Sequence, residues 1–232
     1  MKKEELKRDF LDYYDGFKLK DITSPKYRHL FLILFWPFYL INFFTIERIA
    51  STDYHVIHCA LDDIIPFNEY FIIPYVIWYP FWIAMLFYSV LFEVETFKKT
   101  MKYFILTYSI SLTVYALWHS GHNMWPKIFP HDNFCTWLTQ RIYAADYSTN
   151  ICPSDHVIGA FAVVFAAADS KRLSNRLAMT VILTIAILIT LSICFVKQHS
   201  ALDILAAAPV VLLGYYVCFF RTKRKEKNKM NI

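Results

Sequence analysis

Residues 177–220 read LAMTVILTIAILITLSICFVKQHSALDILAAAPVVLLGYYVCFF, a mostly apolar stretch with one polar break at Lys197-Gln198-His199-Ser200. A single helix of this length would be about 66 Å long, because an α-helix rises ~1.5 Å per residue. That is about twice the ~30 Å thickness of the hydrocarbon core of a bilayer. The stretch therefore predicts two membrane-spanning helices that turn at the polar break.

The overall composition also indicates a membrane protein. Hydrophobic residues make up 57% of the 232 residues and charged residues 19%, against ~45–50% and ~25% in soluble domains. One further apolar run is short and reaches spanning length only if it begins at Pro153. We expect an all-α integral membrane protein with six transmembrane helices, at roughly 30–46, 70–92, 103–118, 156–168, 177–196 and 201–220.

Lysine and arginine predict the orientation, because these residues are enriched in cytoplasmic loops. Of the 24 such residues, twenty lie in residues 1–28, in the turns after the second and fourth spans, and in the tail from Arg221. Both termini are therefore expected in the cytoplasm. The loops expected to face outward are 47–69, 119–155 and 197–200.

The chain divides into three parts by this interpretation. Residues 1–28 would form a cytoplasmic or interfacial segment, residues 29–220 the membrane domain, and residues 221–232 a basic cytoplasmic tail. The basic ends are expected to contact anionic lipid headgroups, and no nucleic-acid partner is expected. The first apolar run begins near residue 30 and no cleavage site follows it, so we expect the N-terminus to be retained.

Two polar segments on the predicted outer side stand at the starts of spans. One is Cys152-Pro153-Ser154-Asp155-His156, and the other runs from Lys197 to Asp203. His199 and Asp203 are four residues apart, so they share one helix face. A helix N-terminus offers free N–H groups and a positive dipole end to a phosphate. Two such ends with two histidines, a serine and a lysine predict a phosphoryl-transfer site.

These segments resemble two motifs of one family, the type 2 phosphatidic acid phosphatase superfamily. Pro153-Ser154-Asp155-His156 is similar to its Pro-Ser-x-His motif, and Ser192 to Asp203 matches the spacing of its third motif, Ser-Arg-x5-His-x3-Asp. The Lys-Gln-His variant resembles a bacterial branch near the inositol-phosphoceramide and sphingomyelin synthases. The resemblance covers roughly residues 62–205.

The resemblance implies a mechanism that needs no metal or cofactor. His199 would attack phosphorus and form a phosphohistidine, and Asp203 would hold its imidazole in the required tautomer. His156 would protonate the leaving alkoxide, while Ser154 would hydrogen-bond the phosphoryl oxygens. Residues 29–220 would then be a six-helix membrane phosphatase domain.

The sequence departs from the family pattern at both motif arginines. Ile193 stands at the third-motif arginine, and in the first motif Trp118 and Trp125 replace the lysine and arginine, so that only Pro126 matches. Arginine makes a bidentate contact to phosphate that tryptophan cannot replace. We expect Lys127 and Lys197 to bind the phosphate in place of the arginines. Further contacts to the substrate are expected from His119, His122 and Ser192.

We expect a metal-independent hydrolase at the plasma membrane that acts on a lipid phosphate or diphosphate from the extracytoplasmic side. A lipid head-group phosphotransferase with the same site is the alternative enzyme, and it differs only in the acceptor. A catalytically impaired lipid-binding protein is a third interpretation, motivated by Trp125 and Ile193. A small transporter is less favoured, because no inverted repeat is visible.

Two structural questions stay open at this point. The acidic residues Asp62, Asp63 and Glu69 are expected to pack a loop more than to take part in catalysis. Cys135 and Cys152 share the predicted outer loop and could form a disulfide in an oxidising compartment.

Overall fold

The computed structural model describes residues 13–222 of the chain, and this part is mostly helical. Its elements, in chain order, are η1 (Leu19–Thr23), η2 (Arg28–Leu34), α2 (Phe35–Ala50), β1 (His55–Val56), α3 (Ala60–Ile64), η3 (Glu69–Phe71), α4 (Ile72–Phe92), α5 (Val94–Leu117), β2 (Ser120–Gly121), α6 (Phe134–Ala145), α7 (Asp155–Asp169), α8 (Arg176–Phe195), α9 (Ala201–Tyr215) and η4 (Tyr216–Phe220). The two strands form a short parallel pair.

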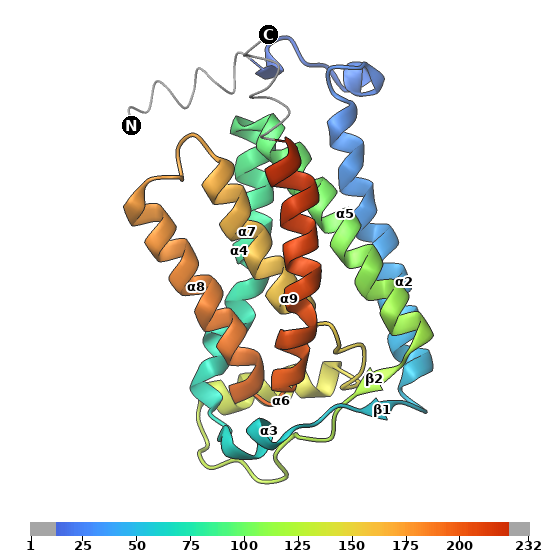
Figure 1. The fold of residues 1–232 in the computed structure, drawn as a ribbon, viewed down its shortest axis with the longest axis vertical. Helices are drawn as coiled ribbons and strands as arrows, with labels where there is room; N and C mark the ends of the chain where they lie inside the picture. Colours follow the sequence, from blue (N-terminus) through green and yellow to red (C-terminus); the bar gives the residue numbers. More distant parts are fainter. Residues whose placement is uncertain (1–12, 223–232) are drawn as a thin grey trace.

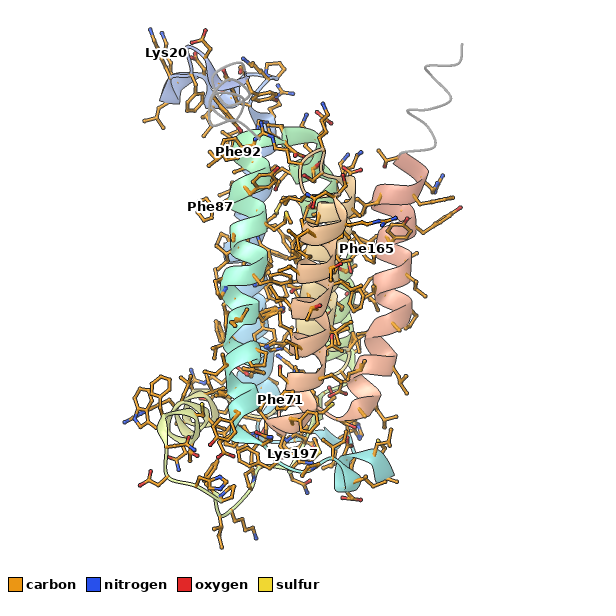
Figure 2. The ribbon with its side chains drawn as sticks, turned by 90° about the vertical axis from the view of Figure 1, so that its left-hand side faces the viewer. Lys20, Phe71, Phe87, Phe92, Phe165 and Lys197 are labelled. Carbon is orange, nitrogen blue, oxygen red and sulfur yellow. The ribbon has the colours of Figure 1, made fainter. Side chains whose placement is uncertain are left out.

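The long helices α2, α4, α5, α7, α8 and α9 run lengthwise beside one another, and the described chain begins and ends at the same end of this bundle (Figure 1). Helices α3 and α6 and the strand pair lie at the opposite end. Figure 2 shows Lys20 at the first end, and Phe71 and Lys197 at the second. The second end, which we call the loop end, carries the predicted outer loops.

Four helical segments are long and apolar enough to cross a membrane: Arg28–Ala50, Glu69–Phe92, Arg176–Phe195 and Ala201–Phe220. The predicted turn at 197–200 between the last two of these is confirmed. Helix α5 is long but carries Glu95, Lys98 and Lys99 near its start, and α7 has only 15 residues. Charge and length therefore leave these two helices outside the apolar set, so four of the six expected spans are helices long and apolar enough to cross a membrane.

Several predicted boundaries shift. The turn after the second span lies at Glu93, because α5 begins at Val94 and includes the lysines that were expected in the turn. The predicted loop 119–155 contains a helix, α6, and Asn133 caps its start by accepting a hydrogen bond from the Thr136 N–H at 3.0 Å. All five cysteines are free thiols, so Cys135 and Cys152 are not paired. Most of the predicted basic tail and the start of the N-terminal segment lie outside the described residues.

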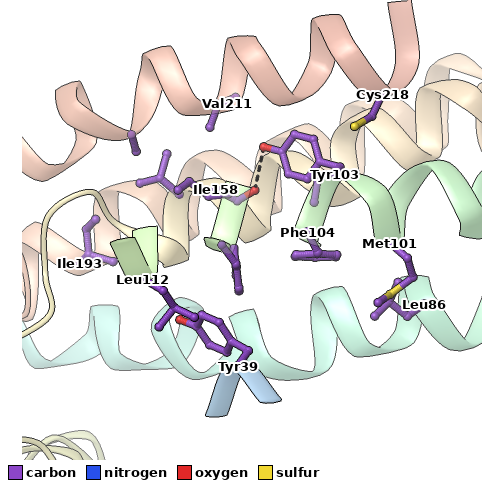
Figure 3. Close-up of a cluster of buried hydrophobic side chains, with 14 of the residues drawn as sticks. Tyr39, Leu86, Met101, Tyr103, Phe104, Leu112, Ile158, Ile193, Val211 and Cys218 are labelled. Carbon is purple, nitrogen blue, oxygen red and sulfur yellow. Dashed lines mark hydrogen bonds between the residues drawn. The ribbon is translucent and has the colours of Figure 1, made fainter. Parts of the chain in front are cut away.

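Helix α7 lies at the centre of the bundle, packed against α4, α5, α8 and α9. Half of its buried residues are glycine or alanine, which lets neighbouring helices approach closely. A Cβ atom built on Gly159 would lie 2.8 Å from both Trp78 Nε1 and Tyr108 Oη. Figure 3 shows part of the cluster of buried hydrophobic side chains, in which the Tyr103 hydroxyl donates a hydrogen bond to the Ile158 carbonyl at 3.2 Å.

The start of α7 is set back from the loop end of the bundle. Figure 1 shows α7 beginning above the level of the loop ends of α4, α8 and α9. The chain between α6 and α7 therefore enters the bundle as coil. Two residues of this coil, Ser148 and Asn150, have left-handed backbone conformations, with φ of 55° and 56°. This coil forms part of the site described next.

Candidate active site

The structure brings together the two polar segments that the sequence singled out. The rings of His156 and His199 lie 5.4 Å apart between centroids, and the Ser154 N–H donates to the Asp203 carbonyl at 3.3 Å. Because α7 and α9 contact each other along the bundle, their N-termini present both histidines to one place.

His199 is held by two acceptors on the same ring nitrogen. Its Nδ1 lies 3.0 Å from the Ile151 carbonyl oxygen and 3.2 Å from Asp203 Oδ2. Both groups accept hydrogen bonds, so the proton belongs on Nδ1 and the lone pair on Nε2. Asp203 is fully buried, and its Oδ2 also accepts from the Ser200 N–H at 3.0 Å.

Asp62 of α3 holds the N-terminus of α9 in place through hydrogen bonds to its side chain. Asp62 Oδ1 accepts from the Ala201 N–H at 2.8 Å, and Asp62 Oδ2 accepts from Ser200 Oγ at 2.5 Å. Burial raises the pKa of Asp62, but hydrogen bonds from Ser200, Ala201 and Cys59 outweigh it and hold the pKa below its usual value. Asp62 therefore acts structurally, and its contacts are to the residues that follow His199.

Lys197 points toward α3. Its Nζ donates to the Asp62 carbonyl at 2.6 Å and to the Ile65 carbonyl. Its backbone is left-handed, with φ of 53°, which turns the chain sharply from α8 into α9. The geometry thus gives Lys197 a bracing contact, and Lys197 does not line the cavity beside His199.

His156 is fixed by aromatic side chains of α4. Its ring lies 4.5 Å from the ring of Tyr75 and 4.3 Å from that of Trp78. Its Nε2 has no hydrogen-bond partner among the described residues, and neither does Oγ of the fully buried Ser154. Both atoms are polar groups that a ligand could satisfy, although Ser154 itself does not line the cavity.

A cavity of about 220 Å³ opens beside the two histidines. Residues from α2, α4, α6, the coil before α7, the turn before α9 and the start of α7, which contributes Asp155 and His156, line it. Its polar lining includes His156, His199, Gln198, Glu47, Asp146 and Asn150. None of the described residues that line it is a lysine or arginine.

The other predicted substrate contacts are not brought to this cavity. Lys127 is exposed in the loop before α6, and Ser192 Oγ donates within α8 to the Ile189 carbonyl at 2.7 Å. His119 accepts through its backbone carbonyl from the His55 N–H at 2.8 Å. His122 is buried close to the site, where burial and the nearby His199 lower its pKa to about 3.

Trp125 and Ile193 stand at the two positions where the family motifs have arginine, and both side chains pack against neighbouring residues. The ring of Trp125 stacks on that of Tyr143 at 4.4 Å between centroids. Ile193 is fully buried, and its carbonyl accepts from the N–H groups of Gln198 and His199 at 2.9 and 3.1 Å. Ile193 therefore shapes the turn that carries His199.

Several residues that line the cavity were not predicted from the sequence as site residues. Glu47 follows directly after the first apolar run, a position where an acidic group is costly unless it has a role. Gln198 lies inside the polar break itself. Asp146 and Asn150 gave no signal, because only the folding of the coil 146–154 into the bundle brings them to the cavity.

Comparisons of the chain with protein-family models, with curated proteins and with solved structures find no match. The described residues contain no cluster of three or more histidine, cysteine, aspartate or glutamate residues that could hold a metal ion.

Proposed function

We propose that this protein is a membrane enzyme that cleaves a lipid phosphate ester through a phosphohistidine formed on His199. One observation carries the proposal: His199 Nδ1 is held by Asp203 and the Ile151 carbonyl, which leaves Nε2 as the nucleophile beside His156. The resemblance of both motifs to type 2 phosphatidic acid phosphatases supports it, as does the burial of His199, Asp203 and Ser154.

In the first step, His199 Nε2 attacks phosphorus and the bond from phosphorus to the leaving oxygen breaks. His156 gives its proton to that oxygen, so an alcohol leaves. In the second step, an acceptor oxygen attacks phosphorus, the P–N bond breaks, and the acceptor proton passes to His156. Asp203 stabilises the imidazolium character that develops on His199, as the carboxylate of a catalytic triad does.

The acceptor decides between hydrolysis and transfer. Water as acceptor gives a lipid phosphatase, and a lipid alcohol gives a head-group phosphotransferase. The cavity is lined by acidic groups and by no described lysine or arginine. This lining favours a singly charged phosphodiester as substrate, and a head-group phosphotransferase that uses one is therefore the second candidate. A dianionic phosphate monoester would be poorly neutralised there, whereas a phosphodiester carries a single negative charge.

We also propose that all six lengthwise helices cross the plasma membrane, with both termini in the cytoplasm and the site near the outer face. Four of these helices are apolar enough by length and composition. The start and end of the described chain lie at one end of the bundle (Figure 1), the end where most lysines and arginines gather.

The test incubates the detergent-purified protein in excess EDTA with phosphatidic acid, phosphatidylglycerophosphate, polyprenyl diphosphate and phosphodiester lipids, and measures the release of phosphate or of a phosphorylated head group. We expect turnover of at least one lipid by the wild type, loss of turnover in His199→Gln, and a covalent phosphate trapped on the wild type alone. His119→Gln is the matched control, because its ring does not line the cavity. Turnover that survives in His199→Gln would overturn the proposal.

A further inference from the structure

One wall of the cavity carries a pair of carboxyl groups that the proposed mechanism does not use. Glu47, near the end of α2, is only 5% exposed. Its side chain is a hydrogen-bonding partner of the Asp146 side chain, which follows α6. Both residues line the cavity that also contains His156 and His199. A hydrogen bond between two carboxyl groups requires one of them to keep its proton, so the pair carries a single negative charge, which attracts a positive charge.

A neighbouring amide oxygen supports a ligand at this wall independently of the acids. Asn150 is 3% exposed, and its Nδ2 donates to the Phe43 carbonyl at 3.0 Å. That bond leaves Oδ1 as the acceptor, and Oδ1 has no partner among the described residues. An unpaired buried acceptor is costly, at about 1–3 kcal/mol, so a donor in the cavity would relieve it.

Aromatic side chains form much of the remaining wall. Phe43 and Phe44 of α2 and Tyr75, Trp78 and Tyr79 of α4 all line the cavity. Aromatic rings attract organic ammonium groups through their π faces. The described lining offers no lysine or arginine that would neutralise the acids from within. Acids, a free amide oxygen and aromatic rings together are suited to an organic cation.

We propose that Glu47, Asp146 and Asn150 form a subsite for the ammonium group of a zwitterionic phosphodiester lipid. The phosphate of the same head group would face His199 and Gln198, whose buried Nε2 has no partner among the described residues. This inference rests on the proposed function for the position of the phosphate. At about 220 Å³ the cavity is smaller than the ~300–1,000 Å³ pockets of drug-sized ligands, so it suits a head group.

The first experiment measures binding without turnover. The His199→Gln protein is titrated with glycerophosphocholine, glycerophosphoethanolamine and glycerophosphoglycerol, and binding is followed by tryptophan fluorescence, since Trp78 lines the cavity. We expect the two ammonium compounds to bind at least about tenfold more tightly than the glycerol compound. Adding Glu47→Gln or Asp146→Asn should remove that preference. Equal affinity for all three compounds would overturn the subsite.

The second experiment measures turnover in nanodiscs with phosphatidylcholine, phosphatidylethanolamine, phosphatidylglycerol or phosphatidic acid. We expect Glu47→Gln to lower kcat/KM for phosphatidylcholine and phosphatidylethanolamine at least about tenfold. The kcat/KM for phosphatidylglycerol should stay within about threefold of the wild-type value. Asp146→Asn is the second variant, so misfolding of one protein does not decide the result. Asp63→Asn is the matched control, because the Asp63 side chain is 70% exposed and contacts His58 outside the cavity.

The two proposals fail in different ways. Turnover that needs His199 but is insensitive to Glu47 and Asp146 would overturn the ammonium subsite and support the proposed function. Ammonium binding that depends on Glu47, without turnover of any lipid, would support the subsite and overturn the proposed enzyme. A preference for phosphatidic acid that is unchanged in both acidic variants would also overturn the subsite.

Discussion

His199 Nδ1 lies 3.2 Å from Asp203 Oδ2, one helical turn further along α9. The first prediction concerns this contact. Asp203→Asn keeps the shape of the side chain but can present an amide N–H to Nδ1, which would shift the ring proton to Nε2. We expect kcat to fall by about 10⁴-fold, the size seen when a triad carboxylate is replaced by an amide.

The measurement is kcat for the best lipid substrate, with the unfolding temperature of each variant beside it. If Asp203→Asn unfolds at the wild-type temperature but has a lower kcat, the loss comes from the changed tautomer of His199 and not from lower stability. A loss of less than about tenfold would contradict this role for Asp203.

The second prediction tests the link between α3 and α9. Asp62→Asn cannot accept all the hydrogen bonds that Ser200 and Ala201 donate to the carboxylate. We expect the free energy of unfolding to fall by about 1–3 kcal/mol, with a lower kcat because His199 precedes this turn. Asp63→Asn should change stability by less than about 1 kcal/mol, since it is an exposed neighbour. Equal effects of the two substitutions would contradict the link.

The third prediction separates bracing from phosphate binding at Lys197. Lys197→Met removes the donor to the Asp62 and Ile65 carbonyls and keeps an unbranched side chain. We expect a loss of about 1.5–3 kcal/mol in unfolding free energy, with KM changed by less than about threefold. A tenfold rise in KM at wild-type stability would instead return Lys197 to the phosphate site.

The fourth prediction concerns the close approach of α7 to α4 and α5. In Gly159→Ala the new methyl group would lie 2.8 Å from Trp78 Nε1 and Tyr108 Oη, so the rings must move. We expect a loss of about 1–3 kcal/mol in stability and lower activity, because Trp78 packs on His156. Adding Trp78→Phe should recover part of the stability. A wild-type melting temperature in Gly159→Ala would contradict this packing.

The fifth prediction is a pH dependence at His122, outside the apolar spans. Burial and the nearby His199 lower the pKa of His122 from 6.5 to about 3. Between these values the unfolded chain binds more protons than the folded one, so unfolding free energy falls as the pH drops, by up to ~1.4 kcal/mol per pH unit.

His122→Gln removes the titrating group, so its stability should fall less steeply than that of the wild type between pH 6.5 and about pH 4. Urea unfolding at several pH values measures the slope. His119→Gln, which changes a half-buried histidine of the same loop, should keep the wild-type slope. Parallel curves for His122→Gln and the wild type would contradict the prediction.

The apolar spans and the meeting of the two motifs could be predicted from the sequence because hydrophobic length and helix-start residues act locally. The polar break at 197–200 became the turn between α8 and α9, as expected. The positions of Lys197 and Lys127 could not be predicted, because charge alone does not say which acceptors a lysine will meet. Lys197 meets carbonyl oxygens of α3, an element only five residues long.

The acidic wall of the cavity could not be predicted for a different reason. Glu47 lies at the end of one helix, and Asp146 comes after another, about a hundred residues further along the chain. Their proximity depends on the coil before α7 entering the bundle, and no local pattern encodes that path. The start of α5 was misplaced because its lysines were assigned to a turn, although a helix readily continues through them.

The short length of α7 sets how far the reaction centre lies from the loop end. This helix has 15 residues, about 22 Å, while α5 has 24, about 36 Å. The coil that takes the place of further helical turns lines the cavity together with His156. The depth of the site therefore depends on the length of α7: inserting one helical turn after His156, with the rest of α7 kept in place, would move the acid group by ~5.4 Å toward the loops. An insertion of this kind would change which part of a head group the two histidines reach, without altering a catalytic side chain.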